Sequence, residues 1–300
     1  TIIIPDNSIN IELETKKSIG YNLFISRDVD SFIYLLYFLT KYKIGILIDK
    51  DNKNNNENNI VISSNSEVKK VLEFYNKIGI KYHNLRNLCI FWHDSNNYLI
   101  PKNIESILLS QIKSKSIIYI FVTIINEDVD HANCLIIDRD NKKVIHFEPY
   151  GQINKHNLEE FDKKFKKLFK KIFPDFIYFA PKDFMPQNSF QRLSNESDPL
   201  ETKVGDIGGF CLAWTLWFFE LYLRNKKVNL SELVNKSIQK IIDSKHSFLE
   251  YIRFYANKLR KFHIKYLTKI KYPAEKIFNI NTTSDEKDYI YNSINSDIQS

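Results

Sequence analysis

Residues Gly205 to Glu220 read GDIGGFCLAWTLWFFE, and they mark the point where a polar loop becomes a strongly apolar helix. Gly208 and Gly209 permit backbone angles that other residues avoid, and they allow another chain to approach closely. Cys211 falls in the first turn of the predicted helix, where unpaired N–H groups and the helix dipole favour a thiolate over a thiol. A free cysteine is more often a small buried hydrophobe, so the rest of the chain must decide whether Cys211 is a nucleophile.

A set of apolar strands precedes this helix. The runs 117–125, 131–137 and 143–147 are rich in β-branched residues and are separated by turn-forming residues. His131 begins the second strand and Glu148 follows the third, so the hairpin predicts that these two side chains face each other. A carboxylate in that position can fix the imidazole tautomer and stabilise its cation. The alternative is a surface histidine near an unrelated glutamate.

A long irregular stretch, 181–206, leads from these strands to Cys211. Long loops inside compact domains tend to be functional, and this one contains two amides, Gln187 and Gln191. Around it we expect a basic amphipathic helix over 157–173, a short strand over 176–180, and helices over 211–224, 230–242 and 246–268. The polar C-terminal end, about 25 residues, is expected to fray.

The first 115 residues predict an α/β layer with no recognisable site. The expected elements are one or two short strands within 1–28, helices over 30–42, 66–78 and 104–113, and strands over 43–48 and 82–92. The residue pattern changes after Ser116, where the β-branched runs begin. We therefore divide the chain into residues 1–115, an N-terminal extension that could bind substrate, and residues 116–300, the catalytic domain.

The charge and cysteine content argue against several classes of protein. The formal charge of +7 could attract nucleic acid or an acidic protein. The paired lysines, however, recur on the 157–173 helix and indicate a solvated basic face, so we do not favour nucleic acid as a partner. Three cysteines without a C-x-x-C pair argue against a disulfide framework or a cysteine-rich zinc site, and they favour an intracellular protein.

Cofactor and membrane signals are missing from the sequence. The histidines show no metal-binding spacing and no phosphate-binding glycine loop is present, so we expect no cofactor and no metal. No apolar run reaches the roughly 18 residues that a bilayer requires, so we expect no membrane partner.

Cys211, His131, Glu148 and a loop glutamine together supply the groups that acyl transfer requires. Cys211 attacks the carbonyl carbon, and His131 takes its proton and later delivers one to the leaving amine. Glu148 orients His131. A glutamine amide, together with the backbone N–H of Cys211, can stabilise the oxyanion.

These segments resemble the adenovirus protease (adenain) and the Ulp1-like SUMO and ubiquitin proteases, together the CE clan of cysteine proteases. In that family a strand-borne histidine is followed across a hairpin by a Phe-Glu-Pro-aromatic-Gly segment, as in FEPYG over 147–151. GGFC over 208–211, before an aromatic helix, is similar to the family's active-site helix. The resemblance covers roughly residues 117–225. Similar arrangements occur in proteins of large DNA viruses, which implies a viral source.

The cysteine departs from the family pattern. Relatives carry the nucleophile before Gly in a Cys-Gly-x-Phe pattern, but here Ile207 stands before the glycines and Cys211 follows Phe210. Two interpretations follow: the loop is shifted so that Cys211 is the nucleophile, or the chain is an inactive relative. CLAW over 211–214 is similar to the papain-type Cys-x-Ala-aromatic helix start and favours the first interpretation.

The glutamine is also displaced from the family pattern. Relatives carry it a few residues before the nucleophile, whereas Gln191 lies 20 positions before Cys211 (211 − 191), which an insertion within 193–205 could explain. We prefer Gln191 to Gln187 because apolar neighbours can anchor it. Asn133, on the same strand face as the histidine, either supports the histidine–glutamate pair or is an ordinary polar strand residue.

The predicted fold is α+β, in the manner of the Ulp1 and adenain proteases. A central mixed sheet carries His131 and Glu148 and packs against the Cys211 helix, with an N-terminal α/β extension. The leading hypothesis is a thiol isopeptidase that cleaves after the small-residue C-terminal tail of ubiquitin or a ubiquitin-like protein. This substrate, and hence this partner, is implied by the resemblance alone.

Three alternatives stay open at this point: a viral maturation protease, an acetyltransferase on the same scaffold, and an inactive relative that only binds. We expect a monomer inside the cell, in the host cytoplasm or in the virion if the source is viral.

Overall fold

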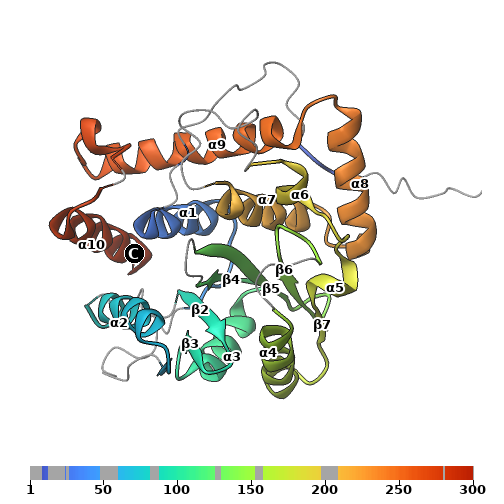
Figure 1. The fold of residues 1–300 in the computed structure, drawn as a ribbon, viewed down its shortest axis with the longest axis horizontal. Coiled ribbons are helices and arrows are strands. Elements are labelled where there is room, and N and C mark those ends of the chain that lie inside the picture. Colours follow the sequence, from blue (N-terminus) through green and yellow to red (C-terminus); the bar gives the residue numbers. More distant parts are fainter. Residues whose placement is uncertain are drawn as a thin grey trace, which may run out of the picture.

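A seven-stranded mixed sheet lies at the centre of the molecule (Figure 1). The computed structural model describes residues 9–12, 24, 27–47, 60–81, 88–125, 130–152, 158–196, 209–279 and 281–299. Within them the strands lie in the order β1-β3-β2-β4-β5-β6-β7. Their bounds are Ile60–Ile62 (β1), Cys89–Asp94 (β2), Asn97–Ile100 (β3), Ile117–Ile124 (β4), His131–Asp138 (β5), Lys143–Phe147 (β6) and Ile177–Phe179 (β7).

Strand β4 joins the two halves of this sheet. It pairs along its whole length with β5, antiparallel, from Ile117 opposite Asp138 to Ile124 opposite His131, and it runs parallel to β2. Strand β5 turns back into β6, and β7 lies parallel to β6 at the edge. β4 is buried almost throughout, as expected for a β-branched strand covered on both faces.

Helices cover both faces of the sheet, so the fold has three layers (Figure 1). Successive residues of a strand point to opposite faces: Tyr119 and Phe121 join the hydrophobic cluster of α7, while Ile118 and Ile120 join that of α4. One face carries α1 (Asp28–Lys41), α7 (Cys211–Arg224) and α9 (Phe248–Lys269), and the other carries α3 (Ile104–Ser114) and α4 (Glu159–Ile172). The predicted α+β fold, with a mixed sheet packed against the Cys211 helix, is confirmed.

The remaining helices lie around this framework. Their bounds are Ser66–Lys81 (α2), Pro181–Phe184 (α5), Phe190–Leu193 (α6), Leu230–Asp243 (α8), Ala274–Lys276 (a 3-10 turn) and Ser284–Gln299 (α10). The two short helices α5 and α6 occupy part of the stretch that we expected to be irregular. Helix α10 occupies the C-terminal end that we expected to fray. Its Ile290, Ile294 and Ile298 recur every four residues and are buried. This helical spacing of apolar residues allows the segment to pack as a helix although most of its residues are polar.

Two further predictions concern the N-terminal part of the chain. The expected strand over 43–48 was wrong for the residues described there, up to 47: a single parallel bridge joins Gly45 to Ile118. Glycine weakens a strand and often marks close backbone approach, and a Cβ at Gly45 would lie 3.0 Å from Ile118. The strands expected within 1–28 lie largely outside the described residues. The division at residue 116 stays a prediction, and β1 to β3 share one sheet with β4 to β7.

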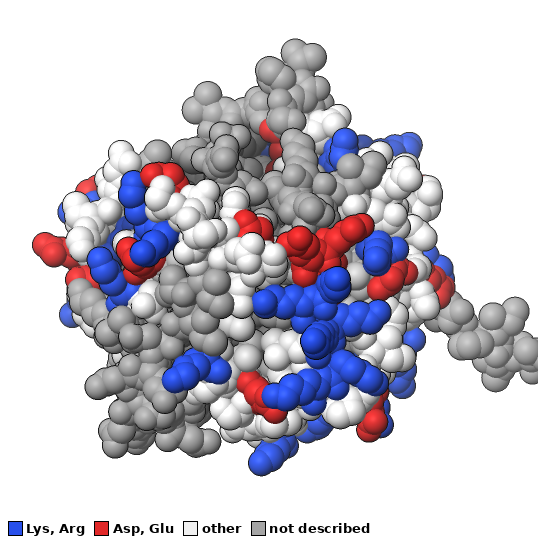
Figure 2. All heavy atoms as spheres, turned by 60° about the horizontal axis from the view of Figure 1, so that its bottom comes forward, with Lys and Arg blue, Asp and Glu red and all other residues white. Residues whose placement is uncertain are grey.

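The basic face of α4 is exposed to solvent, as its sequence pattern indicates. Figure 2 shows lysine and arginine side chains gathered on the lower face of the molecule, where α4 lies. The phenylalanines of α4 point into the core instead. The exposed lysines of this helix are Lys163, Lys166, Lys167, Lys170 and Lys171. In the part of the chain that the structure describes, no helix has the length and apolarity to cross a bilayer.

Candidate active site

Helix α7 carries Cys211 at its first position and packs along β5. The hydroxyl of Thr215 donates to the carbonyl oxygen of Ala132 over 3.1 Å. One turn further on, the ring of Phe218 stacks on Phe147 of β6, with 3.9 Å between ring centroids and 5° between their planes. These contacts hold the first turn of α7 beside the start of β5, where His131 lies.

His131 and Glu148 meet diagonally across the β5–β6 hairpin. Cys134 pairs with Phe147, so the register, carried one residue further, puts Glu148 opposite Asn133 and not opposite His131. Diagonal neighbours on one face remain within reach of long side chains, and His131 Nε2 lies 2.7 Å from Glu148 Oε1. The prediction that the two residues lie directly opposite each other is therefore wrong by two positions, although their side chains are in contact.

The surroundings favour the charged form of both groups. Burial opposes the charge on Glu148, but His131 and hydrogen bonds from the Tyr150 N–H and Asn133 hold the pKa of Glu148 below its ordinary value. Burial also opposes the charge on His131, but Glu148 and a hydrogen bond with Cys211 raise the pKa of His131 to about 10. At neutral pH the pair is therefore an imidazolium beside a carboxylate, in contact with Cys211.

The hydrogen bond to Glu148 also determines which nitrogen of His131 serves Cys211. An ionised carboxylate only accepts hydrogen bonds, so His131 donates from Nε2 and Nδ1 is left to exchange a proton with the thiol. The ring of Tyr150 stacks on the imidazole, with centroids 4.9 Å apart. The imidazole is thus held from its edge by Glu148 and from its face by Tyr150.

Gln191 lies on α6, near the start of α7. Its backbone N–H donates to the carbonyl oxygen of Pro149 over 3.1 Å, which ties α6 to the segment after Glu148. A Cβ at Gly209 would lie 3.9 Å from Gln191 Nε2, so this amide stands near the residues just before Cys211. Gln191 is 6% exposed, whereas Gln187 is exposed. Of the two candidates, Gln191 is therefore the buried one whose amide lies near the start of α7.

Glu196 is a member of this site that the sequence reasoning missed. Its carboxylate accepts from the N–H of Phe210 at 3.0 Å, from Gln191 Nε2 at 2.9 Å and from the indole N–H of Trp214 at 3.0 Å. Burial raises the pKa of Glu196, and these hydrogen bonds oppose the rise. Glu196 therefore caps the start of α7 and holds the Gln191 amide. No spacing marks it in the sequence, because it lies 14 residues before Phe210 in an irregular segment.

A tight turn explains the glycine of the FEPYG segment. Gly151 has a φ of +100°, and a Cβ there would lie 2.5 Å from the carbonyl oxygen of Pro186. That geometry excludes other side chains. The N–H of Gln152 donates to the same oxygen over 3.0 Å, and that of Ser189 donates to Tyr150 over 3.0 Å. The segment carrying Glu148 is thus joined by backbone hydrogen bonds to the segment leading into α6.

The other sequence candidates lie away from this site or are inert. Cys89 and Cys134 are buried, and burial raises the pKa of Cys89 to about 12 and that of Cys134 as well. His263 forms a separate buried pair with Asp30, with 2.7 Å between Nε2 and Oδ1. Among the described residues, no group of three or more His, Cys, Asp or Glu side chains could hold a metal ion.

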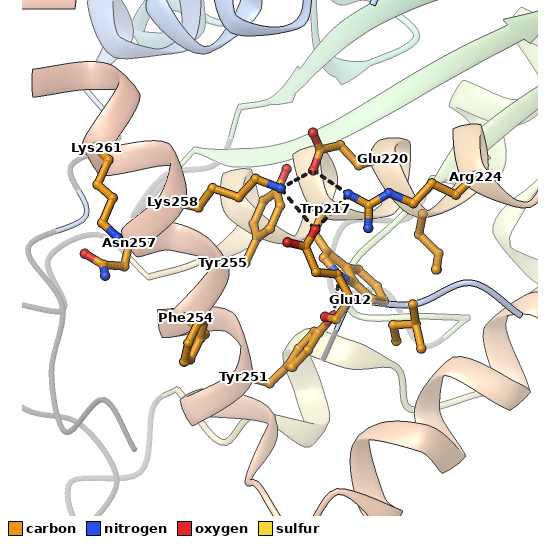
Figure 3. A pocket seen from close by; sticks show the side chains of 12 residues that line it. Glu12, Trp217, Glu220, Arg224, Tyr251, Phe254, Tyr255, Asn257, Lys258 and Lys261 are labelled. Atoms are coloured by element: carbon orange, nitrogen blue, oxygen red, sulfur yellow. Dashed lines mark hydrogen bonds and ion pairs between the residues drawn. The ribbon is translucent and has the colours of Figure 1, made fainter. Parts of the chain in front are cut away.

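A hollow of about 310 Å³ lies between α7 and α9, and an ion cluster lines it (Figure 3). Glu220, 1% exposed, accepts from Lys41 of α1 at 2.7 Å and from Lys258 of α9 at 3.2 Å. Glu12 accepts from Arg224 at 2.8 Å and from the same Lys258 at 3.2 Å. Each carboxylate has cationic partners, so the cluster ties α1, α7 and α9 together.

Comparison with known proteins finds one similar protein sequence and several similar solved structures. No protein-family model matches the chain. An ankyrin repeat protein of Acanthamoeba polyphaga mimivirus is 28% identical over 246 residues, which cover 75% of this chain and 32% of that protein. The chain thus spans about a third of the length of this relative. The viral source stays a prediction.

Two of the similar solved structures are those of Chlamydia trachomatis proteins. ChlaDub1 has a TM-score of 0.41 and 13% identity, covering 81% of this chain and 94% of that chain. The effector protein Cdu1, solved bound to ubiquitin, has a TM-score of 0.41 and 11% identity, covering 88% of this chain and 97% of that chain.

Proposed function

We propose that this chain is a cysteine protease that forms an acyl intermediate on Cys211. The observation that carries the proposal is the buried His131–Glu148 pair, with 2.7 Å between Nε2 and Oε1, in contact with a cysteine at the first position of a helix. A histidine oriented by a carboxylate, next to a helix-terminal thiol, is the arrangement that activates a cysteine nucleophile. This favours an active enzyme over an inactive relative.

The chemistry follows from the charges of the pair. The Cys211 thiolate attacks the carbonyl carbon, and the C–N bond breaks as the His131 imidazolium gives its Nδ1 proton to the leaving amine. The neutral imidazole then takes a proton from water, which attacks the thioester and releases the carboxylic acid product and the thiolate. Glu148 keeps the imidazole in one tautomer and stabilises the cation that the first step consumes and the second step restores.

The negative oxygen of the tetrahedral intermediate requires hydrogen-bond donors. The backbone N–H of Cys211, in the first turn of α7, has no partner within its own helix. Gln191 Nε2 gives one N–H to Glu196 and has a second to offer. We therefore assign these two groups to the oxyanion hole, with Glu196 orienting the amide.

The proposed substrate is the C-terminal tail of ubiquitin or a ubiquitin-like protein. The likeness of FEPYG over 147–151 and GGFC over 208–211 to the CE-clan proteases supports this choice. Two other reactions, processing of a virion precursor and acetyl transfer, can be separated from it by the product formed.

The test is labelling with electrophilic probes built on the C-termini of ubiquitin, SUMO and other ubiquitin-like proteins, with identification of the modified cysteine. We expect a probe to label Cys211, and Cys211→Ala to abolish both labelling and hydrolysis while keeping the fold. A Cys89→Ala variant, which removes a buried and inert thiol, serves as the control and should still be labelled.

The outcomes separate the candidate functions. Hydrolysis that persists in Cys211→Ala would overturn the assignment. Transfer of acetyl from acetyl-CoA without proteolysis would indicate the acetyltransferase. A Cys211 that reacts with no probe and cleaves no precursor would indicate a binding protein.

A further inference from the structure

A chain of hydrogen bonds continues from Glu148 through the sheet to α4. The amide nitrogen Nδ2 of Asn133 lies 3.0 Å from Glu148 Oε2 and 3.1 Å from His146 Nε2. On the other side of that ring, His146 Nδ1 lies 2.7 Å from Asp162 Oδ1, which also accepts from the Tyr178 hydroxyl over 2.7 Å. Asn133, His146 and Glu148 are each 0% exposed, so these groups rely on one another for their hydrogen bonds.

One arrangement of protons satisfies this chain. Asp162 accepts, so Nδ1 of His146 carries a proton, and Nε2, which faces the amide nitrogen of Asn133, is the acceptor. Asn133 then donates one N–H to His146 and the other to Glu148. Turning the amide over would place Oδ1 against the Glu148 carboxylate, which has no proton to offer. Asn133 Oδ1 is left without a hydrogen-bond partner among the described residues.

We propose that His146 and Asp162 act as positioning residues for Glu148 by holding the amide of Asn133, an inference that rests on the protease proposed above. Asp162 selects the His146 tautomer, the bare Nε2 holds the amide, and the second N–H of the amide holds Glu148 Oε2. The other oxygen, Oε1, is shared by His131 and the N–H of Tyr150, which donates over 2.8 Å. Both carboxylate oxygens are thus held in the orientation that His131 needs.

The network acts through the charge on His131, because a well-oriented Glu148 stabilises the imidazolium and hence the thiolate beside it. The titratable groups around it come from three elements: Asp162 on α4, Tyr178 on β7, and Glu148 with His131 at the hairpin. A loosened Glu148 therefore lowers the reactivity of Cys211 at neutral pH. This effect can be measured without any substrate.

The experiment is the rate of Cys211 alkylation by iodoacetamide as a function of pH. We expect His146→Leu and Asn133→Leu to lower the rate at neutral pH by about three- to tenfold. The acid limb of the rate–pH profile should move to higher pH by up to about one pH unit. Asp162→Leu removes the oxygen that accepts from His146 and Tyr178, so we expect it to lower the rate in the same direction.

The matched control is His263→Leu. His263 forms a second buried histidine–aspartate pair, with Asp30 at the same 2.7 Å, between α9 and α1. This variant should lose stability in thermal unfolding without a change in the alkylation profile. Network variants that fold and keep the wild-type profile would overturn the proposal, and so would an equal displacement in His263→Leu.

The two proposals can fail separately. If the alkylation profiles separate as expected but no probe or precursor is processed, the positioning network stands and the protease function falls. If hydrolysis is observed and the profiles coincide, the network falls and the protease stands. A wild-type Cys211 that reacts no faster than an ordinary thiol overturns both.

Discussion

Glu148 receives hydrogen bonds on both of its oxygens, and three of its donors come from different positions of the hairpin: His131, Asn133 and the N–H of Tyr150. Its charge is what keeps His131 protonated in a buried site. A change that keeps the shape of Glu148 but removes the charge therefore tests its role in the chemistry separately from its role in packing.

Glu148→Gln should keep the fold and slow hydrolysis by roughly a hundredfold, within the range that acid–base groups contribute. Without the carboxylate charge, the pKa of His131 falls from about 10. His131 then loses the proton for the leaving amine at lower pH, so the alkaline limb of kcat should move to lower pH. Glu159→Gln, an exposed position on α4, is the control, and unchanged kinetics in Glu148→Gln would remove Glu148 from the mechanism.

The sequence could predict some of these residues and not others. His131 and Glu148 stand out because a hairpin and the FEPYG segment place them, and Cys211 because a glycine pair precedes an apolar helix. Asp162 reaches His146 only when α4 packs on the sheet, and Glu196 reaches α7 only when its loop folds back. Such contacts depend on tertiary packing, which local patterns do not encode.

At the scale of elements, α7 was predictable to the residue, from Cys211 to Arg224, because its apolar character is continuous. The polar C-terminal segment was harder, since the residues between the buried isoleucines of α10 are tyrosine, asparagine, serine and aspartate. The packing of α7 against the sheet was predicted, but the side-chain contact that fixes it was not, because Phe147 and Phe218 are 71 residues apart (218 − 147) and meet only in the folded sheet.

Phe218→Ala should destabilise the protein by about 3–5 kcal/mol, the usual cost of emptying a buried aromatic site. Phe218 is 0% exposed and its ring is stacked on Phe147. Because this contact also holds the first turn of α7 near His131, hydrolysis should fall even where the variant remains folded. Urea unfolding gives the free energy. Phe74→Ala on α2, where the side chain is 45% exposed, should change it by less than about 1 kcal/mol.

At the scale of the whole molecule, the ion cluster around Glu220 links three helices that are far apart in the chain. Glu220 is the buried member of this set, and removing its charge leaves Lys41 without its anion, while Lys258 and Arg224 keep Glu12. The cluster lies along the same helix as the candidate nucleophile, but toward its opposite end. Its loss should therefore be seen in the stability of the helical layer and much less in the chemistry.

Glu220→Gln should lower the free energy of unfolding by about 3 kcal/mol or more, because Lys41 and Lys258 lose their buried anion. Glu232→Gln is the matched control: that side chain is 38% exposed and pairs with Lys236 on α8, so its loss should cost less than about 1 kcal/mol. Equal losses in the two variants would show that the Glu220 cluster contributes no more than a surface ion pair.

Backbone hydrogen bonds join the FEPYG segment, 147–151, to the residues that lead into α6. They have a consequence for how this site can vary. Pro149, Tyr150 and Gln152 are hydrogen-bonded to the backbone of Gln191, Ser189 and Pro186, respectively, so the backbone of Gln191 is fixed to the segment that carries Glu148. The number of residues between Gln191 and Cys211 can then change without moving this backbone. Linear spacing between these two residues is therefore free to diverge among proteins that share the same reactive geometry.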